Sequence, residues 1–554
     1  MIRGLKQGAA PYSFDTGRPT AMGVNGAVAS PHYLASQVGL DILRQGGHAA
    51  DACIAINVTL CVVLDHMAGL GGDMFCQVWD GGSRKVEALN GSGRSGRDAS
   101  IDMYKEKGLD EIPQRGPLAA NTVPGVVEAW AKLHERYGRL EWNRLFEAGI
   151  MYAEAGFPIS EKFSNYILDY AGTLQEFPAT ARVLLPGGFA PEAGFVFRQP
   201  DLARSLRLIV EQGASVFYIG ELAERIVTSL QVAGGLLTHE DFAEHTSEWV
   251  EPVQTAYRGL TVSELPPSTQ GIATLMILNL IENYDLNEIG DGTADFYHLM
   301  TEAVKVAFAD RDRWVTDPRF VDIPVERLTS KDYMQERRTI IDMLHAQHEQ
   351  EVEPGQPHLA ANGGGDTVYM CAVDGDGNTC SLIQSVYHEF GSAFMPEGTG
   401  ILLQNRGSSF KLNPDHPNKL EPRKRTFHTI IPAMALRNNR PFMAFGTMGG
   451  EGQPQTQTAM LARVADFGYN IQQAIEAPRW LYGRTWGEES RTLKLEGRIP
   501  DAVATELKRR GHDVEMLEDW SQKMGHAQGI VIDQEAGVLH AGADPRGEGI
   551  ALAW

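Results

Sequence analysis

A run of three glycines just ahead of a hydroxyl residue constrains this chain more than any other stretch. Residues 363–365 are all glycine, and glycine reaches positive φ at no steric cost, so the backbone can turn back on itself there. Asp366 and Thr367 follow, and residues 368–373 form an apolar run rich in β-forming side chains. The pattern predicts a strained loop that delivers a threonine to the first position of a buried strand.

Thr367 allows two interpretations. In the simpler one it is a β-branched residue that begins a strand. In the other, its Oγ attacks the carbonyl carbon of Asp366, the backbone breaks between the two residues, and Thr367 becomes a new N-terminus. Such a residue holds nucleophile and base together, because its own α-amine can take the hydroxyl proton. The reference pKa of an α-amine is about 7.7–8.0, so part of it is neutral near pH 7.

A second strand is predicted beside the first. Residues 374–378 read Asp-Gly-Asp-Gly-Asn, like the start of a calcium loop, but Thr379 and Ser385 stand where that loop requires glycine and glutamate. Asp-Gly pairs favour a hairpin turn instead. The hairpin would join residues 367–373 to residues 379–385 and bring Ser385 back alongside Thr367.

Composition narrows the class of protein. The 554 residues are 43% hydrophobic and 22% charged, which is ordinary for a soluble globular chain. A net charge of −22 argues against unspecific binding to nucleic acid or anionic membranes. The five cysteines lie in apolar runs without paired spacing, which indicates buried, reduced thiols. No apolar run approaches 18 residues and no secretory signal is visible, so we expect no membrane span and a cytoplasmic protein.

Periodicity predicts mixed helices and strands in one large domain, because no repeat, low-complexity tract or linker interrupts the chain. One expected helix runs from residue 34 to the glycines at 46–47, and the others lie within residues 49–64, 123–156, 199–235, 272–281, 296–314, 334–353 and 456–467. Further strands are expected at residues 74–79, 400–406, 426–435, 441–445, 530–533 and 538–543.

Gly446–Gly450 forms a glycine-rich turn after one of these strands. The backbone N–H groups of Gly449 and Gly450 would suit a developing oxyanion, which acyl transfer stabilises with two donors at about 2.7–3.1 Å. A plain turn before the next helix is the alternative. Another glycine-rich turn, residues 65–73, lacks both the P-loop lysine and the GxGxxG spacing, so it favours a tight turn over a nucleotide site.

The ordered set of motifs resembles the γ-glutamyltransferase (γ-glutamyltranspeptidase) family of N-terminal-nucleophile hydrolases over nearly the whole chain. The matching stretches are residues 46–52, 66–72, 266–271, 317–322, 365–367, 374–378, 400–403, 449–450 and 543–546. The resemblance implies an α+β fold, a four-layer αββα sandwich, and autocleavage into a large chain, 1–366, and a small chain, 367–554. The two chains would form a heterodimer and one structural domain, with further pairing of heterodimers open.

The same resemblance implies catalytic roles. Thr367 would be the nucleophile, Gly449 and Gly450 would line the oxyanion hole, and Ser385 would keep the hydroxyl found near the nucleophile. No metal or organic cofactor is implied, and the expected partner is a small-molecule amide.

The pocket that holds the γ-glutamyl group departs from the family pattern. The family's carboxylate-binding arginine corresponds to Asn90, with Arg94 and Arg97 as stand-ins. Its amine-binding aspartate corresponds to Ser409. A substrate-contacting asparagine corresponds to Tyr387, and a serine pair to His428 and Thr429. Losing the aspartate removes a charge-assisted hydrogen bond to an ammonium, worth roughly 1.5–3 kcal/mol.

Four basic residues lie near this pocket in the sequence: Arg406, Arg423, Lys424 and Arg425. Because arginine pairs well with planar carboxylates, we expect a carboxylate-bearing amide without the amino group, such as an oxalyl or glutaryl amide. The loop of residues 411–425 is shorter than the lid of typical transferases, which favours hydrolysis over transfer.

Two other functions stay open. The chain could be a genuine γ-glutamyl hydrolase or transpeptidase with a rearranged pocket. It could also be a binding protein that is never processed, or a metal hydrolase using His345 and His348, which stand three residues apart.

Overall fold

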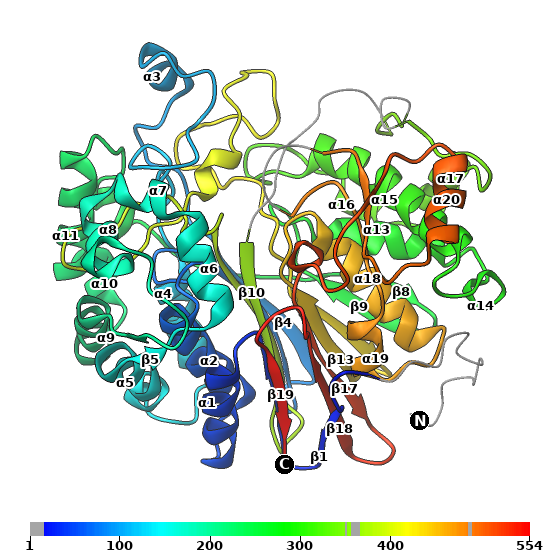
Figure 1. Ribbon diagram of the computed structural model, residues 1–554, viewed down its shortest axis with the longest axis horizontal. Coiled ribbons are helices and arrows are strands. Elements are labelled where there is room, and N and C mark those ends of the chain that lie inside the picture. The colour runs from blue at the N-terminus through cyan, green and yellow to red at the C-terminus, as the bar shows by residue number, and fades with distance from the viewer. Residues whose placement is uncertain (1–15, 349–351, 356–365, 486–489) are drawn as a thin grey trace.

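The protein consists of two seven-stranded sheets packed face to face between two layers of helices, as the computed structural model shows (Figure 1). The structure describes residues 16–348, 352–355, 366–485 and 490–554. Apart from the backbone of Asp366, the predicted cleavage loop at residues 356–366 lies outside the described residues. The two sheets between two layers of helices confirm the predicted α+β class and αββα layering.

The first sheet contains the predicted nucleophile. Its strand order is β19-β2-β10-β11-β3-β4-β7, and it is antiparallel throughout. The bounds are β2 (Ala27–Ser30), β3 (Asp73–Asp80), β4 (Lys85–Gly91), β7 (Glu248–Val250), β10 (Asp366–Val373), β11 (Thr379–Tyr387) and β19 (Ile550–Ala553).

The second sheet has the order β1-β18-β17-β13-β12-β9-β8. The bounds are β1 (Ala21–Gly23), β8 (Val253–Tyr257), β9 (Leu260–Glu264), β12 (Ala433–Arg437), β13 (Arg440–Thr447), β17 (Ala527–Asp533) and β18 (Val538–Ala543). Both sheets thus combine strands from before and after residue 366. Small sheets β5 (Phe157–Pro158) with β6 (Val196–Phe197), and β14 (Trp480–Tyr482), β15 (Leu493–Leu495) and β16 (Val514–Met516), lie apart from them.

Helices cover the outer face of each sheet. On the first sheet these include α1 (Tyr33–Arg44), α2 (Ala49–Val63), α4 (Val126–Tyr137), α5 (Glu147–Ala155), α8 (Pro178–Leu184), α9 (Pro200–Gln212) and α11 (Glu221–Val232) (Figure 1). On the second they include α13 (Gly271–Ile281), α15 (Ala294–Trp314), α18 (Gly452–Ala465), α19 (Ile471–Glu476) and α20 (Asp501–Arg509). None of the described helices is long and apolar enough to cross a membrane.

The period of two along β10 decides where Thr367 lies. Val368 and Met370 belong to the core beneath the helices, whereas Tyr369 and Cys371 belong to the core between the two sheets. Since side chains alternate across a strand, Thr367 shares the inner face with Tyr369. A nucleophile at this position therefore faces the second sheet.

Three expected elements differ in the structure. Of the helix expected at residues 334–353, the described part up to residue 348 contains only α17 (Lys331–Arg338). The carbonyl groups of Asp342, Met343 and Gln347 instead accept hydrogen bonds from side chains of other elements, so tertiary contacts override helix propensity.

The strands expected at residues 400–406 and 426–435 were also wrong. The first makes only one bridge, between Leu403 and Gly71, because its amides bond to several separate segments. The second begins only at Ala433, since the backbone around His428 pairs with Ser268 and Thr269 outside any sheet.

Candidate active site

The start of β10 forms an irregularity in the sheet. Asp366 pairs with Tyr387 and Val368 pairs with Gln384, so Ser385 and Val386 together oppose the single residue Thr367. The hairpin predicted from the Asp-Gly turn is thereby confirmed. Bulges of this kind bend a strand and redirect a side chain.

Thr367 is a buried hydroxyl without a partner. Its side chain is 1% exposed, and Oγ1 has no hydrogen-bond partner among the described residues. Buried hydroxyl groups are normally hydrogen-bonded, so an unbonded one marks a position where reacting groups fit. Across the bulge, Ser385 Oγ accepts a hydrogen bond from the backbone N–H of Tyr387 at 2.8 Å, which fixes this second hydroxyl.

The predicted oxyanion turn follows β13 directly. Gly446 lies against Tyr369 so closely that an added Cβ would stand 2.4 Å from its ring, which brings the end of β13 to the start of β10. Gly449 and Gly450 have φ of +127° and +51°, conformations that favour glycine. The two positive φ values make this a turn that requires glycine, and α18 begins two residues later at Gly452.

Gln270 connects the turn at Gly449 and Gly450 to the segment that contains Thr429. Its Nε2 donates to the carbonyl oxygens of Gly450 at 2.9 Å and Thr429 at 2.6 Å. Its Oε1 accepts from Arg311 Nη1 at 3.0 Å. Glu451 follows the turn and pairs with Arg311 at 3.3 Å; burial raises the pKa of Glu451 to about 7. From the sequence, Gln270 belongs only to the family-matching stretch 266–271, and no role is predicted for it.

Arg406 is the most unusual group in the pocket. It is 1% exposed, and no carboxylate of the described residues forms an ion pair with it. Nη1 donates to Thr429 Oγ1 at 3.2 Å, while Nε and Nη2 have no partner among the described residues. The guanidinium stacks on the Tyr387 ring, 3.8 Å from its centroid. Burial lowers the pKa of Arg406 to about 10, so it stays charged at pH 7.

His428 and Ser409 complete the pocket's unpaired polar atoms. His428 Nε2 lies 3.2 Å from Asp73 Oδ2, and Nδ1 has no partner among the described residues. Ser409, where the family pattern has a carboxylate, is buried with an unpartnered Oγ. Asp73 was missed in the sequence because it appeared to end a tight turn, although it lies on β3 opposite Ser385.

The other predicted binding residues already have partners. Asn90 Oδ1 accepts from the backbone N–H and hydroxyl of Ser92 at 3.0 and 2.7 Å, so it shapes its own loop. Arg94 Nη2 pairs with Glu248 at 2.9 Å. Arg97 forms an exposed ion pair with Glu240.

Three of the four basic residues expected at the pocket are likewise paired elsewhere. Arg423 contacts Glu244 at 2.7 Å, Lys424 contacts Glu421 at 2.9 Å, and Arg425 contacts Glu248 at 2.8 Å. Of these four, Arg406 alone forms no ion pair with a carboxylate of the described residues.

The part of the chain that the structure describes contains two groups of possible metal ligands, one at His345 and one around His298, and both already have protein partners. His345 is exposed and pairs with Asp342 of its own turn at 3.1 Å. Among the described residues, His298, Glu302 and His512 form a buried cluster that could hold an ion. However, the Lys305 ammonium donates to Glu302 Oε1 at 2.7 Å and supplies the positive charge there.

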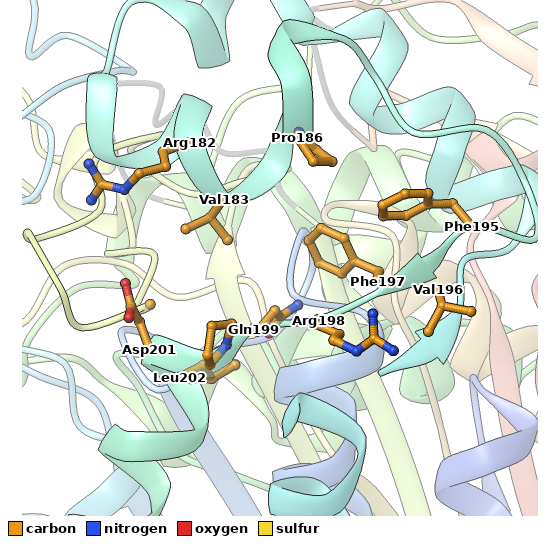
Figure 2. Close-up of a pocket in the computed structure, with 12 residues that line it drawn as sticks. Arg182, Val183, Pro186, Phe195, Val196, Phe197, Arg198, Gln199, Asp201 and Leu202 are labelled. Carbon is orange, nitrogen blue, oxygen red and sulfur yellow. The ribbon is translucent and has the colours of Figure 1, made fainter. Parts of the chain in front are cut away.

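A separate cavity of about 430 Å³ opens in the helical layer over the first sheet. Figure 2 shows the rings of Phe195 and Phe197 on one side of it and Arg182 and Asp201 on the other. Another cavity, of about 260 Å³, is lined by Arg94, Glu248 and Arg319 among others. Thr367 and Arg406 line neither cavity.

Comparison with known proteins agrees with this geometry. The gamma-glutamyltranspeptidase family description matches residues 35–554. The glutathione hydrolase-like YwrD proenzyme of Bacillus subtilis is 46% identical over 96% of this chain and 99% of its own. The oxamate amidohydrolase proenzyme of Klebsiella pneumoniae is 39% identical over 96% of this chain and 98% of its own. The crystal structure of cephalosporin acylase from Bacillus halodurans superposes with a TM-score of 0.90, 38% identity and 98% coverage of both chains.

Proposed function

The chain belongs to the gamma-glutamyltranspeptidase family of self-processing amidohydrolases and transferases, and on that premise we propose that it hydrolyses an amide whose acyl group carries a carboxylate and lacks a free α-amino group. Oxalyl and glutaryl amides are the acyl classes we propose. The observation that carries this proposal is Arg406, a buried guanidinium with two unpartnered donor nitrogens.

The pairing of charges supports the acyl class. Asp73 acts on Arg406 only through space, and a substrate carboxylate would give the two unpartnered guanidinium nitrogens a charge-assisted, hydrogen-bonded partner. An ammonium placed in the same pocket would meet the Arg406 guanidinium and would find Ser409 where the family pattern has a carboxylate, while the nearby Asp73 carboxylate is already engaged by Gly93, Gly125, Gln404 and His428. Electrostatics therefore favours glutaryl over γ-glutamyl amides.

The proposed reaction has two stages. The backbone first breaks before Thr367, which separates residues 1–366 from residues 367–554. The freed α-amine then takes the Thr367 hydroxyl proton as Oγ attacks the substrate carbonyl, and the N–H groups of Gly449 and Gly450 stabilise the oxyanion. The amine leaves, and water hydrolyses the acyl-enzyme. Ser385 orients the nucleophile, while Tyr387, Arg406, Ser409, His428 and Thr429 select the acyl group.

Comparing the hydrolysis of glutaryl and γ-glutamyl anilides tests the acyl class. We expect a higher kcat/KM for the glutaryl compound. A clear preference for γ-glutamyl would instead support the second candidate, a γ-glutamyl hydrolase, which the name of the Bacillus subtilis relative favours.

Processing is tested separately with the Thr367→Ala variant. On a denaturing gel, the unmodified protein should give two bands and the variant one full-length band without amidase activity. A single band for active unmodified protein would refute self-cleavage, and a single inactive band would favour an unprocessed binding protein.

A further inference from the structure

The two carboxylate oxygens of Asp73 have separate sets of partners. Oδ1 accepts from the backbone N–H of Gly93 at 3.1 Å, from that of Gly125 at 3.1 Å and from Gln404 Nε2 at 3.0 Å. Oδ2 lies 3.2 Å from Nε2 of His428. The side chain is fully buried. One oxygen therefore holds the carboxylate in place and the other faces the imidazole.

This arrangement fixes the position of the proton on His428. Burial, together with Arg406 and Arg425, holds the pKa of His428 well below its usual value, so the ring is neutral at pH 7. A neutral imidazole has one N–H, and a carboxylate oxygen can only accept. The proton is consequently on Nε2, and Nδ1 keeps its lone pair.

Nδ1 of His428 is a buried acceptor without a partner among the described residues. It belongs to the residue next to Thr429, whose hydroxyl accepts from the Arg406 guanidinium. Arg406 also acts electrostatically on His428, so a substrate carboxylate anchored on Arg406 would bring its neighbouring atoms to the imidazole. Leaving a buried acceptor unpaired is unfavourable, so the ligand that fits best supplies a donor.

We infer that Asp73 is a positioning residue that holds His428 as the Nε2–H tautomer, and that the acyl group carries, beside its carboxylate, a neutral hydrogen-bond donor such as a hydroxyl, which Nδ1 accepts. The inference rests on the proposed function, because it takes Arg406 as the carboxylate anchor. A keto oxygen in place of the hydroxyl would face the Nδ1 lone pair. An ammonium would donate equally well but would be repelled by the guanidinium.

Four five-carbon diacids, the hydrolysis products of such amides and their analogues, test this inference. Glutarate, 2-hydroxyglutarate, 2-oxoglutarate and glutamate differ only at the carbon beside one carboxylate. Calorimetric titration of the processed protein at pH 7.5 should show 2-hydroxyglutarate binding about 2- to 10-fold tighter than glutarate, the range of one neutral hydrogen bond. We expect 2-oxoglutarate to bind more weakly than glutarate.

The Asp73→Asn variant should abolish that preference, because a hydroxyl and a keto oxygen can both accept from an Nδ1–H. The asparagine Oδ1 can keep the three donors that Asp73 Oδ1 has, while its amide nitrogen becomes a donor toward His428 Nε2. The ring proton would then move to Nδ1, which becomes a donor. The Kd ratio of 2-oxoglutarate to 2-hydroxyglutarate should fall by about 10-fold or more. Equal weakening of all ligands would mean that Asp73 is only structural, and the inference would fail.

Two further measurements test whether Asp73 acts through the imidazole and which ring nitrogen of His428 is protonated. In a His428→Phe background, Asp73→Asn should leave the ratio unchanged, because Asp73 acts through the imidazole. If these variants do not fold, nitrogen-15 spectra of the unmodified protein decide, since a protonated Nδ1 on His428 would overturn the inference. Tightest binding of glutamate would refute the proposed function, whereas tight glutarate binding without any hydroxyl advantage would refute this inference alone.

Discussion

Arginines occur in two contrasting settings in this protein. In the acyl pocket, Arg406 is buried and forms no ion pair among the described residues. In the Glu248 cluster, which consists of Glu248, Arg94, Arg319 and Arg425, three guanidinium groups share one carboxylate. Arginines of the same sequence appearance therefore differ in whether a carboxylate of the protein pairs with them, and the unpaired Arg406 is the one we propose for substrate binding.

The carboxylates of the two regions respond to their surroundings in opposite ways. Burial raises the pKa of Asp73 to about 6, although hydrogen bonds from Gln404 and Gly93 work against the rise. Desolvation would also raise the pKa of Glu248, but Arg425 and Arg94 outweigh it and lower the value to about 2. In the pocket, burial outweighs the attraction between Asp73 and Arg406, whereas in the Glu248 cluster the attraction to arginines outweighs burial.

Removing the two kinds of arginine should separate activity from stability. Arg406→Met should lower kcat/KM for a glutaryl anilide roughly 100-fold, because charge-assisted hydrogen bonds to the substrate carboxylate are lost. Its melting temperature should stay the same or rise, since an unpaired buried charge disappears. Arg425→Met is the matched control and should lose stability while keeping most activity. Equal activity losses in both variants would erase the distinction between the regions.

Removing the shared carboxylate tests the Glu248 cluster from its other side. Glu248→Gln leaves three guanidinium groups without their counterion, so we expect the free energy of unfolding to fall by about 1–3 kcal/mol. Urea denaturation measures it. A variant as stable as the unmodified protein would show that the cluster contributes nothing to the fold.

The pH dependence of stability should have opposite signs in the two regions. Because the folded pKa of Asp73 lies above its unfolded value of 3.8, stability should fall by about 2 kcal/mol as pH rises from about 4 to about 6. Glu248 has a lowered folded pKa, so its contribution, about 1 kcal/mol after solvent screening, is present above pH 4.5 and is lost as pH falls toward 2.

Denaturation midpoints measured across pH for Asp73→Asn and Glu248→Gln check both signs. Each variant should lose its own slope and keep the other. If either variant lost the pH dependence in both ranges, the assignment of one range to Asp73 and the other to Glu248 would be wrong.

The smallest effect is expected at the exposed rim. Arg423 is 52% exposed and pairs with Glu244, so Arg423→Ala should change the free energy of unfolding by no more than about 0.5 kcal/mol. Activity toward the glutaryl anilide should also stay within about 2-fold. A large loss of activity would instead show that Arg423 takes part in substrate binding although it is paired with Glu244.

Local patterns predicted the parts of the site that depend on a few neighbouring residues. The hairpin of β10 and β11 followed from Asp-Gly turn chemistry, and the turn at Gly449 followed from glycine's access to positive φ. The layered α+β fold followed from the resemblance of the ordered motifs. These features are encoded within short stretches of sequence.

The pairing of charged groups was beyond local patterns. Asp73 and His428 are 355 positions apart, and no spacing rule relates them. Arg406 and Arg425 look alike in the sequence, yet only the folded neighbours reveal that Glu248 occupies one of them. The expected strand at residues 400–406 failed for a similar reason, because its amides bond to loops that come from distant parts of the chain.

The interleaving of strands has a mechanical consequence. β10 lies between β2, which precedes residue 366, and β11, which follows it, and in the second sheet β18 pairs with β1 and β12 pairs with β9, again across that boundary. Opening one peptide bond ahead of Thr367 would therefore leave the molecule in one piece, since parting the fragments means tearing both sheets apart. Fragments 1–366 and 367–554, produced together in one cell, should accordingly assemble around each other without ever having shared a backbone.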